Sequence, residues 1–250
     1  MKYRFLIIAL VILFGLMCVE EISAQPVPKI TLEFPKGGGK QEFGLAIQIL
    51  FFITVLSLIP AILIMMTSFT RLVIVFHFLR LALGTQQSPA NQIIIGLSFF
   101  LTFFVMQPVW NEINKNSVQP YLQERISQSD ALDKAIKPMR KFMLKETREK
   151  DLMLFVRLAD MESPKTPDDL PLHVLIPSFI ISELRIAFQI GFVIYLPLIL
   201  IDLIVGVVLM SMGMMMLPPI TISLPFKILV FVLVDGWYLV VESVLSGIRA

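Results

Sequence analysis

The sequence predicts an all-α, membrane-associated protein made of kinked helices and broken helical hairpins, with one small charged helical lobe. Hydrophobic residues make up 56% of the 250 residues, charged residues make up 16%, and the mean hydropathy is +0.82. These values are far more apolar than those of soluble domains. Long apolar stretches flank a central stretch that carries most of the dense charge, so we expect membrane-associated helices on either side of a solvated lobe.

Residues 1–24 have the layout of a secretory signal peptide. Basic residues precede an apolar run over Phe5–Val19, and a polar stretch follows, so we expect cleavage between Ala24 and Gln25. Cleavage would leave the start of the mature chain outside the inner membrane. Ile22 is larger than the small residue preferred at its place before the cleavage site, so an uncleaved membrane anchor is the alternative.

Residues 25–42 are expected to form a flexible leader, because prolines and three consecutive glycines prevent a packed core. Residues 43–110 are expected to form a first helical pair. Its first helix, over residues 43–66, is long enough to cross a hydrocarbon layer of roughly 30 Å, and Pro60 should kink it. Its second helix is expected over Ile93–Val109.

Three basic side chains interrupt the apolar sequence between these two helices, namely Arg71, His77 and Arg80. Basic residues in a short connection mark the cytoplasmic side of a membrane, so we interpret them as a topology signal. A lone histidine on an apolar helix is usually a packed side chain, and we assign His77 no chemistry.

Residues 111–171 are expected to form the charged helical lobe, on the periplasmic side. Between Asn111 and Leu170 there are 11 basic and 11 acidic residues, so this segment is neutral overall and water-exposed. We interpret its charges as a solvated face, with a partner surface as the alternative. Apolar residues recur at spacings of three and four, as in amphipathic helices, at Met139, Phe142, Met143, Leu152, Phe155 and Val156.

Residues 172–250 return to high apolarity and are expected to form C-terminal helical hairpins. Charges within an apolar assembly normally persist by pairing or by facing a water-filled cavity. A straight helix folded back at Pro218 and Pro219 would set Lys227 opposite Ser211, which leaves this lysine without a partner.

A helix break at Pro197 gives a better match of charges. Equal counts on both sides of Pro197 bring Glu183 level with Ser211, and therefore with Lys227. We therefore predict re-entrant hairpins broken at Pro197, with an ion pair between Glu183 and Lys227, within one chain or between subunits. The alternative is that both charges lie at interfaces and never meet.

The stretch from Met210 to Pro219 is expected to be the loop between two apolar helices. Gly213 adds backbone freedom, and Pro218 and Pro219 should end the preceding helix near Leu217. Methionine is flexible and polarizable, so it either fills gaps in a buried hairpin or forms a deformable seal around an axis shared by several copies. Five methionines crowd this loop, namely Met210, Met212, Met214, Met215 and Met216.

The sequence gives no sign of an enzyme. It contains no glycine-rich phosphate loop, no HExxH pair and no nucleophile with a base at a recognised spacing. Cys18 is the only cysteine, which excludes an internal disulfide and a cysteine metal cluster, and we expect no cofactor. A net charge of +2 with mixed signs gives no basic field for nucleic acid.

Four stretches together resemble the FliP family of flagellar type III export gates, and the resemblance runs from about Phe43 to the C-terminus. His77 departs from the small or aliphatic residue that is more frequent in the family at this place. The four stretches are MTSFTRLVIVFHFLRLALGTQQSPANQIIIGLSFFLTFFVMQPVW (66–110), PSFIISELRIAFQIGF (177–192), MSMGMMMLPP (210–219) and PFKILVFVLVDGW (225–237).

This resemblance implies an assembly. FliP-like subunits form a ring of about five copies, completed by FliR and surrounded by FliQ, with FlhA and FlhB completing the export apparatus. The ring is a helical cone in the inner membrane, within the flagellar basal body and raised toward the periplasm. It passes unfolded flagellar proteins, and the methionine loop corresponds to its gasket. The resemblance also makes an inter-subunit pair between Glu183 and Lys227 plausible.

Two other interpretations remain. An ion-coupled secondary transporter would use Asp202 and Asp235 as a proton relay, although we find no convincing inverted repeat between the halves of the sequence. A structural anchor would tolerate any apolar replacement in the methionine loop.

Overall fold

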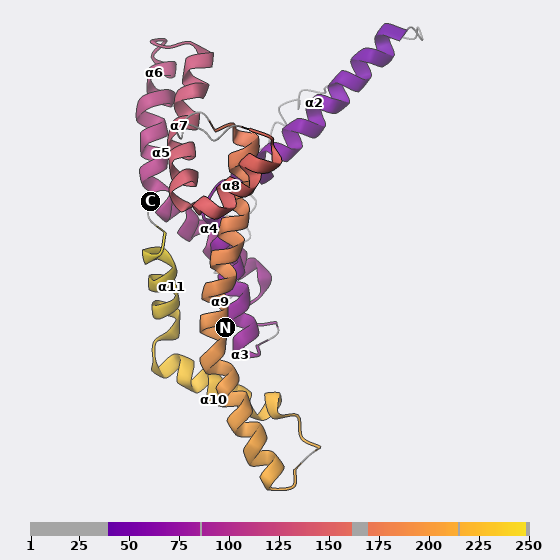
Figure 1. Cartoon of the computed structure of the whole chain (residues 1–250), viewed down its shortest axis with the longest axis vertical. Coiled ribbons are helices and arrows are strands. Elements are labelled where there is room, and N and C mark those ends of the chain that lie inside the picture. Colours follow the sequence, from indigo (N-terminus) through magenta and orange to yellow (C-terminus); the bar gives the residue numbers. More distant parts are fainter. Residues whose placement is uncertain (1–39, 86, 162–169, 215, 249–250) are drawn as a thin grey trace, which may run out of the picture. The chain divides into compact units, whose positions relative to one another are not determined.

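The computed structural model describes residues 40–85, 87–161, 170–214 and 216–248, and this part of the chain is helical without a strand (Figure 1). The described residues divide into two units between Thr54 and Val55, and all the packing described below lies in the second unit. The elements in order are α2 (Lys40–Met65), α3 (Phe69–Leu83), α4 (Asn91–Val105), α5 (Gln107–Ile113), the π-helix η1 (Asn114–Val118), α6 (Gln119–Leu122), α7 (Gln128–Glu146), α8 (Glu149–Leu158), α9 (Leu172–Ser211), α10 (Pro219–Leu233) and α11 (Gly236–Ser246).

The core of this second unit forms where α3 packs along α9 (Figure 1). Leu72, Val75 and Leu79 of α3 are completely buried, and their spacing of three and four places them on one face of the helix. Leu175 and Phe179 of α9 are buried with them. The apolar period of α3 therefore determines which face meets α9.

α9 is one continuous helix of 40 residues that contains Pro177 and Pro197, so the predicted hairpin break at Pro197 is wrong. A proline inside a helix removes one hydrogen bond and costs roughly 3 kcal/mol when nothing compensates. Here the residues around Pro197 remain packed, because Ile194 lies against the core and Leu198 is buried. Tertiary packing on both sides of the proline keeps the helix intact.

Two described helical stretches are long and apolar enough to cross a membrane, Ile47–Met65 and α9. Two bent pairs also qualify if each counts as one span: α4 with residues 107–122, bent by 56°, and α10 with α11, bent by 65°. At 1.5 Å per residue, α9 is about 60 Å long, roughly twice the thickness of the hydrocarbon layer. A perpendicular α9 would therefore extend well beyond the bilayer.

The charged segment after α4 folds into a series of helices, of which α7, with 19 residues, is the longest. Ser127 caps the N-terminus of α7, because its hydroxyl accepts a hydrogen bond from the backbone N–H of Asp130 at 3.2 Å. Pro120 cannot donate to the carbonyl one turn earlier, and the chain widens into η1 just before it. Of the six apolar residues singled out in the sequence, Met139, Phe142, Met143 and Val156 are buried, and Leu152 and Phe155 are partly buried.

A glycine allows one close approach between the two main helices. A Cβ atom added to Gly191 of α9 would lie 2.6 Å from Cγ of Phe78 in α3, closer than real Cβ contacts. The Phe78 ring also packs edge-on against Phe188, with ring centroids 5.2 Å apart. The absence of a side chain at Gly191 therefore makes room for Phe78.

We expect Gly191→Ala to separate α3 from α9 or to displace Phe78, with a loss of about 1–3 kcal/mol in the free energy of unfolding. Thermal unfolding of the detergent-solubilised protein measures this. Gly96→Ala in α4 is the matched control, because its added Cβ meets nothing within 4 Å. Equal midpoints for the two variants would contradict the packing described here.

Candidate functional site

The methionine loop, residues 212–218, connects α9 to α10, and glycine geometry fixes its start. Gly213 has a φ of +77°, which is left-handed and costs other residues about 1–2 kcal/mol. Its N–H donates to the carbonyl of Met210 at 3.0 Å, and the N–H of Met214 donates to the carbonyl of Leu209 at 3.0 Å. These two bonds form a Schellman motif, which satisfies the last carbonyls of α9.

This motif explains why α9 ends at Ser211 and not near Leu217, as the prolines suggested. Pro218 and Pro219 act on the following helix instead. Pro219 is the first residue of α10, where its missing N–H has no cost, and Pro218 precedes it with extended backbone. Gly213 therefore ends one helix and Pro219 begins the next.

The methionine side chains of the loop, and that of Met210 in the last turn of α9, are exposed in the single chain. Met216 is 98% exposed and Met212 is 67% exposed, and Met210 and Met214 are also exposed. Met215 lies outside the described residues. A methionine that fills a gap within one chain would be buried, so these side chains are not gap fillers inside the chain.

A buried lysine sets how α10 lies against α9. Nζ of Lys227 is 2.6 Å from a carboxylate oxygen of Asp202, and it also donates to the carbonyl of Ala82 at 3.0 Å. Ser223 donates to the other carboxylate oxygen of Asp202. Lys227 is 3% exposed, so this lysine joins α10 to α9 and to the C-terminal end of α3.

The predicted ion pair between Glu183 and Lys227 does not form within the chain, because Lys227 pairs with Asp202 and Glu183 pairs with Arg71. The prediction placed the turn at the two prolines. Asp202 and Lys227 are instead equidistant in sequence from a point between Met214 and Met215. The true centre of the hairpin is about one helical turn earlier, inside the methionine loop.

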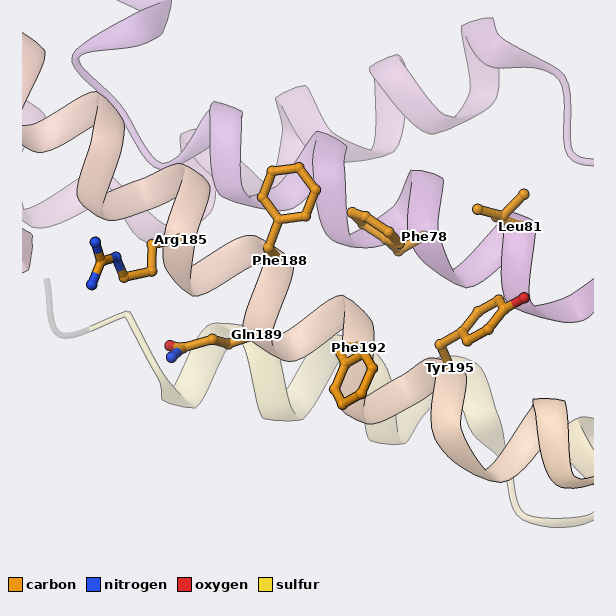
Figure 2. A pocket seen from close by; sticks show the side chains of 7 residues that line it. All are labelled: Phe78, Leu81, Arg185, Phe188, Gln189, Phe192 and Tyr195. Atoms are coloured by element: carbon orange, nitrogen blue, oxygen red, sulfur yellow. The ribbon is translucent and has the colours of Figure 1, made fainter.

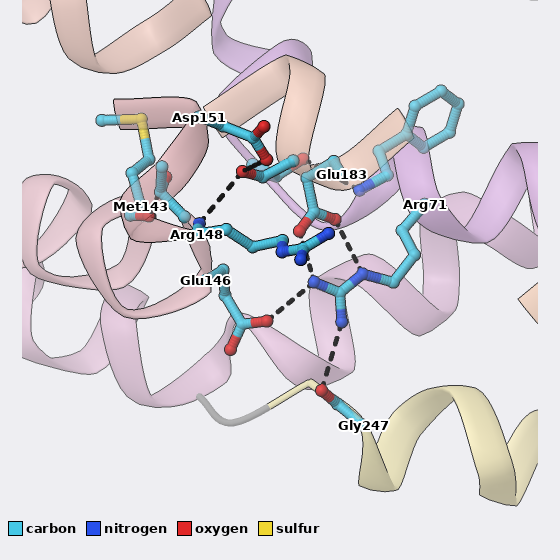
Figure 3. Close-up of polar contacts among 11 residues, drawn as sticks. Arg71, Met143, Glu146, Arg148, Asp151, Glu183 and Gly247 are labelled. Atoms are coloured by element: carbon cyan, nitrogen blue, oxygen red, sulfur yellow. Dashed lines mark hydrogen bonds and ion pairs between the residues drawn. The ribbon is translucent and has the colours of Figure 1, made fainter. Parts of the chain in front are cut away.

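Arg71 is the centre of a second buried cluster (Figure 3). Its Nε donates to Glu183 at 2.9 Å, with a second bond to the other oxygen of that carboxylate, and its Nη2 donates to Glu146 at 2.7 Å. Nη1 donates to the carbonyl of Gly247 at 3.2 Å. One side chain thereby joins α3, α7, α9 and the residue that follows α11.

The Arg71 cluster is almost dry, because the side chains of Arg71 and Glu183 are each 1% exposed and that of Glu146 is 6% exposed. Burial lowers the pKa of the Arg71 guanidinium, but the hydrogen bonds and charges of Glu183 and Glu146 outweigh it and leave this pKa above its ordinary value. Arg71 is therefore a permanent cation. The interpretation of Arg71 as a topology signal stays a prediction, and the buried contacts of this side chain were not expected from the sequence.

A neighbouring polar group fixes the corner between α7 and α8. Ser182 of α9 donates to Asp151 at 2.8 Å and accepts from the backbone N–H of Arg148 at 3.0 Å. Figure 3 shows Arg148 and Asp151 beside the Arg71 cluster. The α7–α8 corner is therefore held against α9 by hydrogen bonds as well as by apolar contacts.

An apolar groove lies between α3 and α9 (Figure 2). Its volume is about 490 Å³, and Phe78, Phe188, Phe192 and Tyr195 line it. Arg185 lies at one end, where it approaches Asp151 at 3.4 Å. Exposed apolar surface of this kind is normally covered by lipid or by another protein chain.

No group of three or more histidine, cysteine, aspartate or glutamate residues among the described residues is placed to hold a metal ion. The buried charges among the described residues instead form ion pairs within the chain. The described chain thus has three features at successive positions along α9. They are the buried Arg71 cluster that joins the supporting helices, the ion pair that fixes the hairpin, and the exposed methionine loop.

The sequence profile described as "FliP family" matches residues 52–244, which include Arg71, Glu183, Lys227 and the methionine loop. The chain belongs to the FliP family. It is 55% identical over 201 residues to the flagellar biosynthetic protein FliP of Bacillus subtilis (strain 168), covering 80% of this chain and 91% of that relative.

Two other FliP proteins are similar over nearly the whole chain. The FliP of Pectobacterium carotovorum subsp. carotovorum is 49% identical, with 91% of this chain and 88% of the relative covered. The FliP of Aquifex aeolicus (strain VF5) is 50% identical, with 88% and 92% covered. The family membership thus rests on both halves of the sequence and on the charged segment between them.

The described part of this FliP family member omits some predicted features. The proposed cleavage site between Ala24 and Gln25 lies outside the described residues.

The sequence did not predict the partners of Arg71, which lie 75 and 112 residues away along the chain. The available signal was an arginine inside an apolar run, which implies a buried carboxylate partner.

We expect Arg71→Leu to lower the free energy of unfolding by roughly 3–5 kcal/mol, because it leaves two carboxylates buried without their cation. Denaturation of the purified protein, followed by helical circular dichroism, measures the loss. Replacing the whole cluster by apolar residues, as Arg71→Leu with Glu146→Leu and Glu183→Met, should recover most of it. A single variant as stable as the parent would contradict the role of Arg71.

A double-mutant cycle tests the pairing of Lys227. Asp202→Asn and Lys227→Met should show a coupling free energy of about 0.5–3 kcal/mol, because the two side chains are in direct contact. Glu183→Gln and Lys227→Met provide the control cycle, and their effects should add to within about 0.5 kcal/mol. Coupling in the second cycle and none in the first would restore the pairing expected from the sequence.

Proposed function

We propose that the protein is a core channel subunit of a flagellar type III export gate, which passes unfolded flagellar proteins across the bacterial inner membrane. Two observations support this. The chain belongs to the FliP family, and its relatives bear the name flagellar biosynthetic protein. The observation that carries the mechanism is the exposed methionine loop at the tip of the hairpin of α9 and α10.

In this proposal several copies surround an axis, and their methionine loops form a gasket. We expect a ring of about five copies with FliR and FliQ, served by FlhA and FlhB, as the family resemblance implies. Exposed loop methionines support such a ring, because a single chain leaves them without a packing partner. Apolar residues on the two helices that flank the loop, such as Leu203 of α9 and Leu233 of α10, are also exposed, at 61% and 74%.

Methionine suits a seal of this kind physically. Its unbranched side chain and polarizable sulfur repack around irregular shapes, so a ring of loops can exclude water when closed and yield to a passing chain. The methionine side chain has no hydrogen-bond donor and only a weak acceptor, so it does not select one substrate sequence over another. A gate for many unfolded substrates requires both properties.

The charge pair of the hairpin supports the same mechanism. Asp202 and Lys227 lie at equal sequence distances from the middle of the loop, and their bond to each other prevents the two helices from sliding. The loop is therefore deformable, while the hairpin that carries it is fixed. This combination keeps the methionine loop of each copy at the same position along the shared axis.

The location in this proposal is the inner membrane within the flagellar basal body. The length of α9 supports a helical cone raised toward the periplasm, because a helix of about 60 Å exceeds the bilayer core. The charged helices α5 to α8 would then form a lobe on the periplasmic side.

The contacts of Asp202 count against a secondary transporter. A proton relay needs a carboxylate that can exchange protons, whereas Asp202 is bonded to both Lys227 and Ser223. Asp235, the other candidate, is exposed at the corner between α10 and α11. Asp202 therefore takes part in the ion pair between α9 and α10, whereas Asp235 lies at the exposed corner before α11.

Replacing Met210, Met212, Met214, Met215 and Met216 together by alanine should leave the subunit folded and assembled, because the described loop side chains make no internal core. The closed assembly should become permeable to small ions, since the gasket has lost its bulk. Ion flux through proteoliposomes that contain the purified assembly measures the leak.

The control variant replaces Met65 and Met153, which are exposed outside the loop, and it should leave the ion flux unchanged. An assembled loop variant that remains as tight as the parent would refute the gasket. It would favour a structural anchor, which tolerates small apolar replacements in the loop.

A further inference from the structure

A row of lysines follows one side of α7. They are spaced by three, four and four residues, so successive members lie about one turn apart on the same side of the helix. Lys115 of η1 lines the same surface from across the gap. The α7 members are Lys134, Lys137, Lys141 and Lys145, and with Lys115 they define what we call the lysine groove.

The surface beneath these lysines is hollow. Two adjoining hollows of about 380 and 210 Å³ share Glu112 of α5 and Pro138 of α7 as common walls. Val109 and Phe142 form part of the floor, and they are only 7% and 3% exposed. The lysine groove therefore has an apolar floor and a cationic rim.

The rim charges have no ion-pair partner among the residues that the structure describes. All five lysines are exposed, and none of them forms an ion pair within the described part of the chain. The acids of α7 serve other contacts, because Asp130 bonds to Ser127 and Glu146 bonds to Arg71. Asp133 is also exposed on α7, and Glu112 is the one acid that lines the groove itself.

The lysine groove is too long for a small ion. From Lys134 to Lys145 the row extends about 16 Å along the helix axis, at 1.5 Å per residue. We propose that the lysine groove binds an acidic segment of a partner protein, with its carboxylates opposite the lysines and an apolar side chain against Phe142. This assignment is independent of the methionine loop and of the gasket.

Two features favour a protein segment over the phosphates of an anionic membrane. A membrane surface presents a broad plane of head groups, whereas the lysine groove is a narrow hollow with an apolar floor. Glu112 within the hollow repels phosphates and carboxylates alike, but a peptide also brings backbone N–H groups, from which the Glu112 carboxylate can accept a hydrogen bond. Complementary charge would speed the encounter and fix the register of the bound segment.

Fluorescence anisotropy tests the proposal with the full chain in a nonionic detergent. The probe is a fluorescein-labelled peptide whose glutamates repeat at the spacing of the α7 lysines on an alanine and leucine background. A second peptide with glutamine in place of glutamate is its control. We expect the acidic peptide to bind, the glutamine peptide to bind at least about tenfold more weakly, and added salt to weaken the complex.

Two protein variants with equal net charge locate the binding. Lys137→Gln with Lys141→Gln removes two charges from the groove, and Arg125→Gln with Lys150→Gln removes two exposed charges elsewhere. The groove variant should bind the acidic peptide at least about tenfold more weakly, and the second variant should bind as the parent does. Helical circular dichroism of both variants should match that of the parent.

Any of three results would overturn the proposal. The first is that the acidic peptide does not bind, and the second is that both variants lose it equally; either reduces the lysines to a solvated face. The third is that short-chain phosphatidylglycerol binds to the parent and not to the groove variant, while the acidic peptide fails to displace it. That result would assign the lysine groove to lipid head groups.

Discussion

The buried guanidinium of Arg71 is the contact on which the arrangement of the helices depends. It joins carboxylates from α7 and α9 to α3, and it reaches the carbonyl of Gly247 beyond α11. Breaking such a cluster leaves uncompensated charge in a dry interior, which costs far more than the loss of one surface ion pair. Apolar contacts alone would let helices of this composition slide along one another. Hydrogen bonds to the planar guanidinium of Arg71 allow only one geometry.

A second buried ion pair fixes the helices in the same way farther along α9. Asp202 receives Lys227 from α10, and Lys227 also caps a carbonyl at the end of α3. Both charge clusters thus involve α3 and α9, so this pair forms a frame to which α7, α10 and the end of α11 are attached. The methionine loop projects from that frame. Its start is set by the left-handed Gly213, its end by Pro219, and its side chains remain free to repack.

Local sequence signals predicted much of this structure and failed where distant contacts decide. Apolar periodicity predicted an all-helical chain with membrane-compatible helices and amphipathic helices in the charged segment. Pro197 predicted a break that does not occur, because packing around Leu198 outweighs one lost hydrogen bond. The partner of Lys227 was missed because the turn was placed about one helical turn too late. The role of Arg71 depends on residues 75 and 112 positions away, which no local pattern reveals.

The central claim is that methionine loops of several copies meet around one axis. Disulfide cross-linking of Met212→Cys, in a chain with Cys18→Ser, tests it most directly, because Met212 is exposed and Cys18 is the only native cysteine. In membranes that contain the complete export gate, mild oxidation should join neighbouring subunits through position 212. Met153→Cys, on α8, should give no such product. An intact multi-copy assembly in which position 212 never cross-links would contradict the account, since its loops would have no common axis to seal.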